Sequence, residues 1–133
     1  MGINLKVMSV PKAKEPLKVS RANATLEHCT HSTDLITLFV YEECLERLSE
    51  EFQDKLIEGI ISNISYDSEK DRIIIDNDVV HNIARMRRKY ENYVDIVETA
   101  SIVIQDIADE ERRRKEEEKL RKKEEKEAKK RQG

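Results

Sequence analysis

The amino-acid sequence predicts a mainly α-helical protein. We expect a long antiparallel helical hairpin, with helices at 33–58 and 78–108 joined by a short β-hairpin at 60–76. Apolar residues recur every three or four positions along both long segments, as on one face of a helix. The chain has only three glycines and two prolines, too few for the many turns of a sandwich or barrel. Charged residues make up 40% of the chain and aromatic residues 5%, a bias typical of long helices.

The charge of the chain changes sign along its length. Its 133 residues suit one domain rather than two. Residues 1–21 carry five bases and one acid, 22–108 carry eight bases and eighteen acids, and 109–133 carry twelve bases and nine acids. We therefore expect an extended basic N-terminal arm at 1–21, a helical hairpin domain at 22–108 and a charged helical tail at 109–133. The acidic central part repels phosphate, so contact with nucleic acid would come from the two ends.

The N-terminal segments carry weak structural signals. Residues 3–8 alternate between apolar and polar side chains, which favours a short strand. The lysine-rich segment between Pro11 and Pro16 lacks an apolar face, so we expect it to be extended. Residues 20–29 have a weak stripe that a short helix would show.

The first strong helical pattern covers 33–58. Ser32 or Thr33 suits its N-cap, and Gly59 suits a C-terminal stop. Its opposite face is acidic. The apolar stripe consists of Leu35, Leu38, Tyr41, Leu45, Leu48, Phe52 and Leu56.

Residues 60–76 have the pattern of two short strands. Positions 60–66 alternate, 67–71 are rich in turn-forming residues, and 72–76 contain three consecutive isoleucines. We interpret this stretch as a β-hairpin. The alternative extends the first helix to about residue 64 and follows it with a loop.

The second helix should continue into the charged tail. Asp76 or Asn77 suits its N-cap. The sequence contains neither glycine nor proline from residue 60 to residue 132. Leu120 and Ala128 are the only apolar residues of the tail, so the tail has no coiled-coil seam. Six of its glutamates precede a lysine or arginine by four positions, and each such pair stabilises a helix by about 0.2–0.5 kcal/mol. We expect a single charged helix, with disorder as the alternative.

One end of the expected hairpin is apolar on more than one face. A helix in a two-helix hairpin buries one stripe, whereas 35–45 and 93–107 carry more apolar residues than that. Either residues 22–31 fold back over them, or a second subunit or a partner protein docks there. Two hairpins that meet at this end would make a four-helix bundle. The turn near residue 68 should also place the basic cluster 85–89 beside acidic residues at 46–51. The expected protein interface consists of Leu35, Ile36, Phe39, Val40, Val94, Ile96, Val103 and Ile104.

The sequence contains no recognisable catalytic pattern. It has no glycine-rich phosphate loop, no nucleophile motif and no Glu-x-x-His. His28, Cys29 and His31 lack the paired spacing of a zinc site. We therefore predict no enzymatic activity, catalytic residue, metal, cofactor or small-molecule substrate.

The remaining composition predicts a protein that is cytoplasmic or otherwise intracellular, with a virion as the alternative. Two cysteines form no disulfide framework, which favours a reducing compartment. No apolar run has the length of a membrane span or of a signal peptide, so we expect no membrane partner.

These patterns predict a non-enzymatic protein–protein interaction or assembly module, homo-oligomeric, that docks through the apolar end of its hairpin. The alternative is a regulator of nucleic-acid machinery, such as a viral or plasmid-borne accessory, that contacts polymerase or DNA through its arm and tail. The residues expected to contact phosphate or an acidic partner are Lys12, Lys14, Lys18, Arg21, Arg112, Arg113, Arg114 and Lys115.

Overall fold

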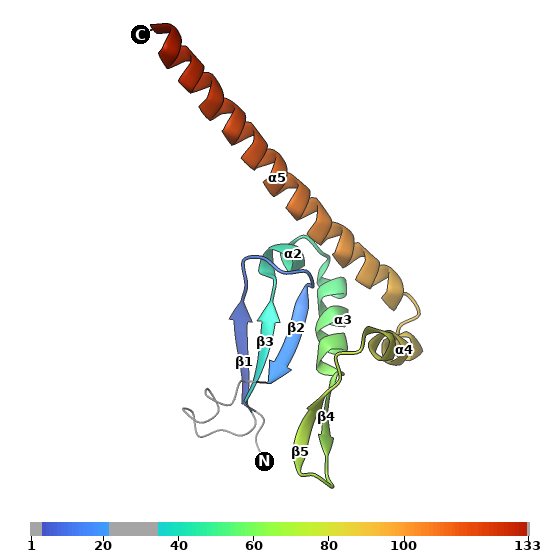
Figure 1. The fold of residues 1–133 in the computed structure, drawn as a ribbon. Helices are drawn as coiled ribbons and strands as arrows, with labels where there is room; N and C mark the ends of the chain where they lie inside the picture. Colours follow the sequence, from blue (N-terminus) through green and yellow to red (C-terminus); the bar gives the residue numbers. More distant parts are fainter. Residues whose placement is uncertain (1–3, 22–34, 133) are drawn as a thin grey trace.

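The fold, seen in a computed structural model, consists of two small β-sheets packed with helices, and its last helix projects far from the rest (Figure 1). The structure describes residues 4–21 and 35–132. The predicted long helical hairpin is wrong, because most of its first helix is replaced by a strand and two shorter helices. The expected four-helix bundle depended on that hairpin and is withdrawn with it.

A three-stranded sheet forms one side of the molecule. Its strands are β1 (Asn4–Ser9), β2 (Leu17–Arg21) and β3 (Leu35–Val40), in the order β1-β3-β2. The central strand β3 runs parallel to β1 and antiparallel to β2. The predicted basic arm therefore contributes two strands, joined by the lysine-rich segment, rather than extending away from the domain.

The strand β3 explains why 35–40 is apolar at successive positions. Ile36, Thr37 and Leu38 are all buried, and β3 is the central strand, with a paired strand on each side. A short apolar run of this kind does not distinguish a buried strand from a helix by its period. Its leucines also match the spacing of a helix, which is why the sequence predicts a helix here.

Two helices follow β3. α2 (Glu42–Glu46) is short, and α3 (Glu50–Ile61) begins after Ser49, whose Oγ accepts a hydrogen bond from the Phe52 N–H at 3.2 Å. This N-cap starts a new helix. Gly59 does not end the helix as predicted, but is buried within α3 and has no positive φ.

The second sheet is a two-stranded antiparallel pair within the range 60–76. β4 (Ile64–Asp67) pairs with β5 (Arg72–Ile75), and Asp71 in their turn has a φ of 47°. Ile73 of β5 packs against Val19 and Ile36 of the first sheet. The pair therefore closes one end of the core instead of linking two long helices.

The predicted second helix is divided in two. α4 (Val79–Lys89) begins at Asp78, whose Oδ1 accepts from two backbone N–H groups at 2.9 and 3.2 Å. α5 (Tyr93–Gln132) starts after a bend at Tyr90, which has an extended backbone. No glycine or proline causes this bend. Its side-chain contacts hold it, since Tyr90 donates a hydrogen bond to Glu58 at 2.6 Å.

The first part of α5 covers the core, and the rest leaves the molecule. Leu17, Leu38, Leu56, Ile96 and Ala100 form one buried cluster from β2, β3, α3 and α5. From residue 112 to 132 every side chain of α5 is exposed. The charged tail is thus a single helix that continues beyond the body (Figure 1).

The ion pairs also differ from those expected of a hairpin. Lys89 pairs with Glu58, and Arg85 contacts Asp76 at 3.5 Å, so the basic cluster does not lie along 46–51 as predicted. Arg47 instead pairs with Glu110 of α5 at 2.8 Å. The reason is that Arg47 directly follows α2, and α2 packs against α5.

Candidate interaction surfaces

The outer edge of β1 is the first candidate surface. β3 lies along one side of β1, and no strand within 4–21 or 35–132 pairs with the other side. The side chains of Leu5, Val7 and Met8 are 48%, 61% and 41% exposed. An open edge strand with exposed apolar side chains on both faces is unusual. Proteins generally protect such an edge with charged residues, with proline, or with a helix or loop that covers it.

The backbone of β1 directs alternate residues to that edge. Val10 donates its N–H to the Val40 carbonyl at 2.9 Å, so its N–H points toward β3. Since the direction alternates along a strand, Lys6 and Met8 also direct their N–H and C=O groups to β3. Leu5, Val7 and Ser9 therefore direct theirs outward.

The opposite edge of the sheet is occupied. The Asn77 amide donates to the Val19 carbonyl at 3.4 Å, and β2 also contacts α3 and β5. Of the two sheet edges, β1 is the one that the described residues leave available.

The predicted apolar interface does not form one exposed patch. Ile36 is 1% exposed and Ile96 is 0% exposed, so both lie inside the core. Val40, Val103 and Ile104 are half-buried against the same core. Phe39 and Val94 are also half-buried, and the side chain of Leu35 lies outside the described part. The apolar excess of 35–45 and 93–107 thus serves largely to pack a strand against a helix.

Sequence analysis missed Leu5, Val7 and Met8 as surface residues. The alternation at 3–8 indicated a strand, but the order of strands in the sheet decides which edge stays open. That order depends on pairing between distant segments, which alternation alone does not reveal.

Two of the predicted basic segments meet in the structure. Lys12, in the segment between β1 and β2, lies 3.7 Å from Glu111 of α5, and Lys115 lies 3.3 Å from the same carboxylate. These cations hold the pKa of Glu111 below its usual value, with Lys115 the larger cause. Lys14 and Lys18 line a pocket. Arg21 ends β2, and Arg112, Arg113 and Arg114 begin the exposed part of α5.

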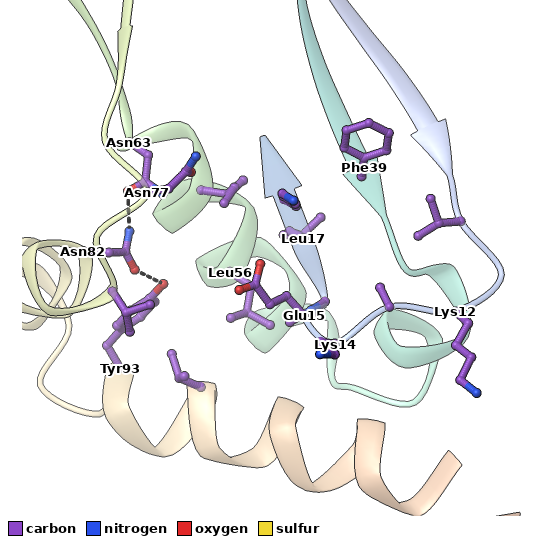
Figure 2. A pocket seen from close by; sticks show the side chains of 17 residues that line it. Lys12, Lys14, Glu15, Leu17, Phe39, Leu56, Asn63, Asn77, Asn82 and Tyr93 are labelled. Carbon is purple, nitrogen blue, oxygen red and sulfur yellow. Dashed lines mark hydrogen bonds between the residues drawn. The ribbon is translucent and has the colours of Figure 1, made fainter. Parts of the chain in front are cut away.

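That pocket has a volume of about 620 Å³ and is open to solvent. Leu17, Leu56 and Val97 supply apolar walls, while Asn63, Asn77, Asn82 and Tyr93 stand at one end (Figure 2). Lys12, Lys14 and Glu15 stand at the other end (Figure 2).

The polar end of the pocket is a connected hydrogen-bond network. Tyr93 donates to Asn82 Oδ1 at 3.0 Å, and the Asn82 amide donates to the Gly59 carbonyl at 2.8 Å and to Asn63 Oδ1 at 2.9 Å (Figure 2). Arg85 donates to the same Asn63 oxygen at 2.7 Å. Burial raises the pKa of Tyr93, so its hydroxyl stays protonated. The network joins α3, α4 and α5, and its side chains are largely engaged with one another. The Arg85 Nε is the exception, since it is buried and has no hydrogen-bond partner among the residues described.

The perturbed ionisable groups are similarly structural. Hydrogen bonds from Lys89 and Tyr90 lower the pKa of Glu58. The backbone N–H of Asp78, followed by His81, lowers the pKa of Asp76. Each group is paired at the surface between neighbouring elements, and no paired acid and base faces the pocket among the residues described.

Neither metal-ligating side chains nor a reactive cysteine forms a site in the described part of the chain. Within 4–21 and 35–132, no group of three or more His, Cys, Asp or Glu side chains is placed to hold a metal ion. The weak candidate cluster at 28–31 lies outside the described residues. Cys44 is buried, its Sγ lies 3.8 Å from the Ala100 carbonyl, and burial raises the pKa of its thiol.

Among the described helices, none combines the length and apolar character required to cross a membrane. Comparisons with protein-family models, with curated proteins and with solved structures find no match.

Proposed function

We propose that the protein is a non-enzymatic interaction module that binds a protein chain along the outer edge of β1. The observation that supports the proposal is the open edge itself, with Leu5 and Val7 exposed beside unpaired backbone groups. Docking through the apolar end of a helical hairpin is not retained, because the hairpin is absent.

Strand addition explains how such an edge binds. An incoming extended segment forms main-chain hydrogen bonds with the edge, and its alternate side chains meet those of the edge strand. Lys6 is the one charged side chain of β1, so the strand has little of the charge that usually opposes pairing. The long charged helix α5 extends beyond the end of the sheet and does not run along β1 (Figure 1).

A proline at position 7 tests the proposal selectively. The Val7 N–H points outward, so Val7→Pro removes a donor from the open edge while the hydrogen bonds between β1 and β3 remain. Val7→Thr is the matched control, since threonine keeps the N–H and a β-branched side chain. Circular dichroism and the unfolding midpoint establish that both variants fold.

The assay is affinity capture from the native host with the wild-type chain and both variants, read by mass spectrometry. We expect a protein that the wild type and Val7→Thr capture and that Val7→Pro loses. Capture of the same proteins by Val7→Pro contradicts binding at this edge. So does a lack of any captured protein when the chain also shows no self-association.

Contact with nucleic acid is the second candidate function. The contact of Lys12 and Lys115 with Glu111 favours it, because it brings the basic segment 10–16 to the start of the arginine run. A salt titration of DNA binding tests it, since each phosphate contact adds about 0.9 to the negative slope of log affinity against log salt. Deletion of 112–132 should reduce that slope. An absence of binding at low salt removes this candidate.

A further inference from the structure

We propose that the chain bound at the edge of β1 is the β1 of a second copy, antiparallel and centred on Val7. This inference rests on the interaction function above and specifies its partner and register. It follows from the alternation of the backbone groups, the position of the one charge and the faces of the exposed side chains.

The backbone favours the Val7-centred register. In an antiparallel pair of strands, two opposite residues exchange two N–H···O bonds when both direct their N–H and C=O groups toward the other strand. With Val7 opposite Val7, the outward-facing Leu5 lies opposite Ser9 of the second copy, and Ser9 lies opposite Leu5. All three outward-facing residues of each copy are then hydrogen-bonded.

The neighbouring registers are poorer for two reasons. Centring the pair on Lys6 places the two Lys6 side chains directly opposite, at a position where Cα atoms approach to about 4.5 Å, and like charges there are destabilising. It also leaves Ser9 without an opposite residue in the part of the chain that the structure describes. Centring the pair on Met8 leaves the outward groups of Leu5 unpaired. The Val7-centred register instead places Lys6 opposite Met8.

The side chains agree with this arrangement. Leu5 and Val7 are in register with Ile36 and Leu38 of β3, so all four lie on the same face of the sheet. Ile36 and Leu38 are buried, yet Leu5 and Val7 remain 48% and 61% exposed. α3 lies on the β2 side of the sheet, away from β1 (Figure 1). A two-fold axis normal to the sheet keeps this face continuous. It places Val7 beside its copy and Leu5 diagonally across from the Val7 of the second copy.

The pair should be weak. One strand of about five residues buries much less than the roughly 800 Å² per partner of a standard interface. We therefore expect association at high micromolar concentration and a monomer on dilution. Sedimentation velocity over that concentration range measures the exchange between the two.

Cysteine cross-linking reads the register directly. The background variant is Cys29→Ser, and buried Cys44 is retained. Val7→Cys should form a disulfide-linked dimer under mild oxidation, because paired Cα atoms about 5.5 Å apart lie within disulfide range. Lys6→Cys alone should not cross-link. The two copies of residue 6 are offset by two residues along the strands, so their Cα atoms lie beyond the roughly 7 Å that a disulfide can span. A mixture of Lys6→Cys and Met8→Cys should cross-link.

The outcomes separate this inference from the proposed function. Val7→Pro in an uncross-linked chain should weaken self-association by about tenfold or more, because each copy loses one hydrogen bond. A monomer at every concentration, or Lys6→Cys cross-linking as fast as Val7→Cys, overturns the self-pairing. If Val7→Pro still loses a captured protein in that case, the edge binds another partner and the proposed function stands. If self-pairing is absent and no captured protein depends on Val7, both fail.

Discussion

Gly59 gives the sharpest test of how α3 and α5 are packed. A Cβ added at Gly59 would lie 2.2 Å from the Tyr93 Oη and 3.0 Å from the Tyr93 Cζ. The first distance is shorter than non-bonded atoms allow and the second is tight, so Gly59→Ala must displace the tyrosine ring. The displaced hydroxyl would lose its 3.0 Å hydrogen bond to Asn82.

The size of the effect follows from three contributions. Overpacking a filled site costs about 1–3 kcal/mol, and leaving a buried polar group without its partner costs about 1–3 kcal/mol. Alanine in place of glycine inside a helix gains about 1 kcal/mol. We expect Gly59→Ala to lower the free energy of unfolding by about 1–5 kcal/mol.

Urea unfolding followed by far-ultraviolet circular dichroism measures this change, and Tyr93→Phe supplies the control. Phenylalanine removes the Oη that lies closest to the added methyl group. Gly59→Ala should therefore cost at least about 1 kcal/mol less in the Tyr93→Phe background, as a coupling between contacting residues. If Gly59→Ala in the otherwise wild-type chain raises the free energy of unfolding by the full gain in helix propensity, the packing described is refuted.

Three further predictions concern stability. Asn82→Ala removes the amide that links α3 to α5 and should lower the free energy of unfolding by about 1–3 kcal/mol in urea titrations; an unchanged midpoint contradicts a structural role for the network. The pKa of Glu58 is lowered chiefly by Lys89, so the stabilisation that Glu58 provides is complete above the ordinary glutamate pKa of about 4.3 and is lost as the pH falls through the lowered folded value. Thermal midpoints of the wild type and Glu58→Gln should therefore differ at neutral pH and converge in acid, whereas a constant difference argues against the pair. Deletion of 112–132, whose side chains are all exposed, should reduce the helical signal and change the free energy of unfolding of the body by less than about 0.5 kcal/mol; a larger loss shows that the tail packs on the body.

Local patterns in the sequence carry part of this fold. The isoleucine run at 73–75 lies in β5, because β-branched residues fit a pleated, half-buried surface. The acid–base spacing of the tail lies in one continuous helix, and two of its pairs, Glu111–Lys115 and Glu118–Lys122, are formed at 3.3 and 3.4 Å. These features depend on neighbours within a few positions, which is why the sequence shows them.

The pairing of distant segments is what local patterns leave undetermined. The residues of β3 match the spacing of a helix and the composition of a strand equally well. Only the strands on either side, β1 from 4–9 and β2 from 17–21, decide in favour of the sheet. Their own signals are weak, so the sheet could not be assembled from them one at a time.

The bend between α4 and α5 is not predicted by the sequence for a similar reason. Neither glycine nor proline occurs there. Tyr90 is held by Glu58, and Lys55 lies 4.8 Å from the centre of its ring. Tertiary contacts thus end the helix where propensity alone would continue it. The candidate surface depends on the same long-range information, since β1 is an edge only because β3 is central.

Amide hydrogen exchange along β1, resolved by NMR, tests the open edge most directly. In a dilute sample the amides of Lys6, Met8 and Val10 should exchange slowly, because they point to β3, and those of Leu5, Val7 and Ser9 should exchange fast. At high concentration, or with a bound partner, the second set should become protected while the first stays unchanged. Uniform exchange of all six amides at every concentration would contradict an edge strand that binds another chain.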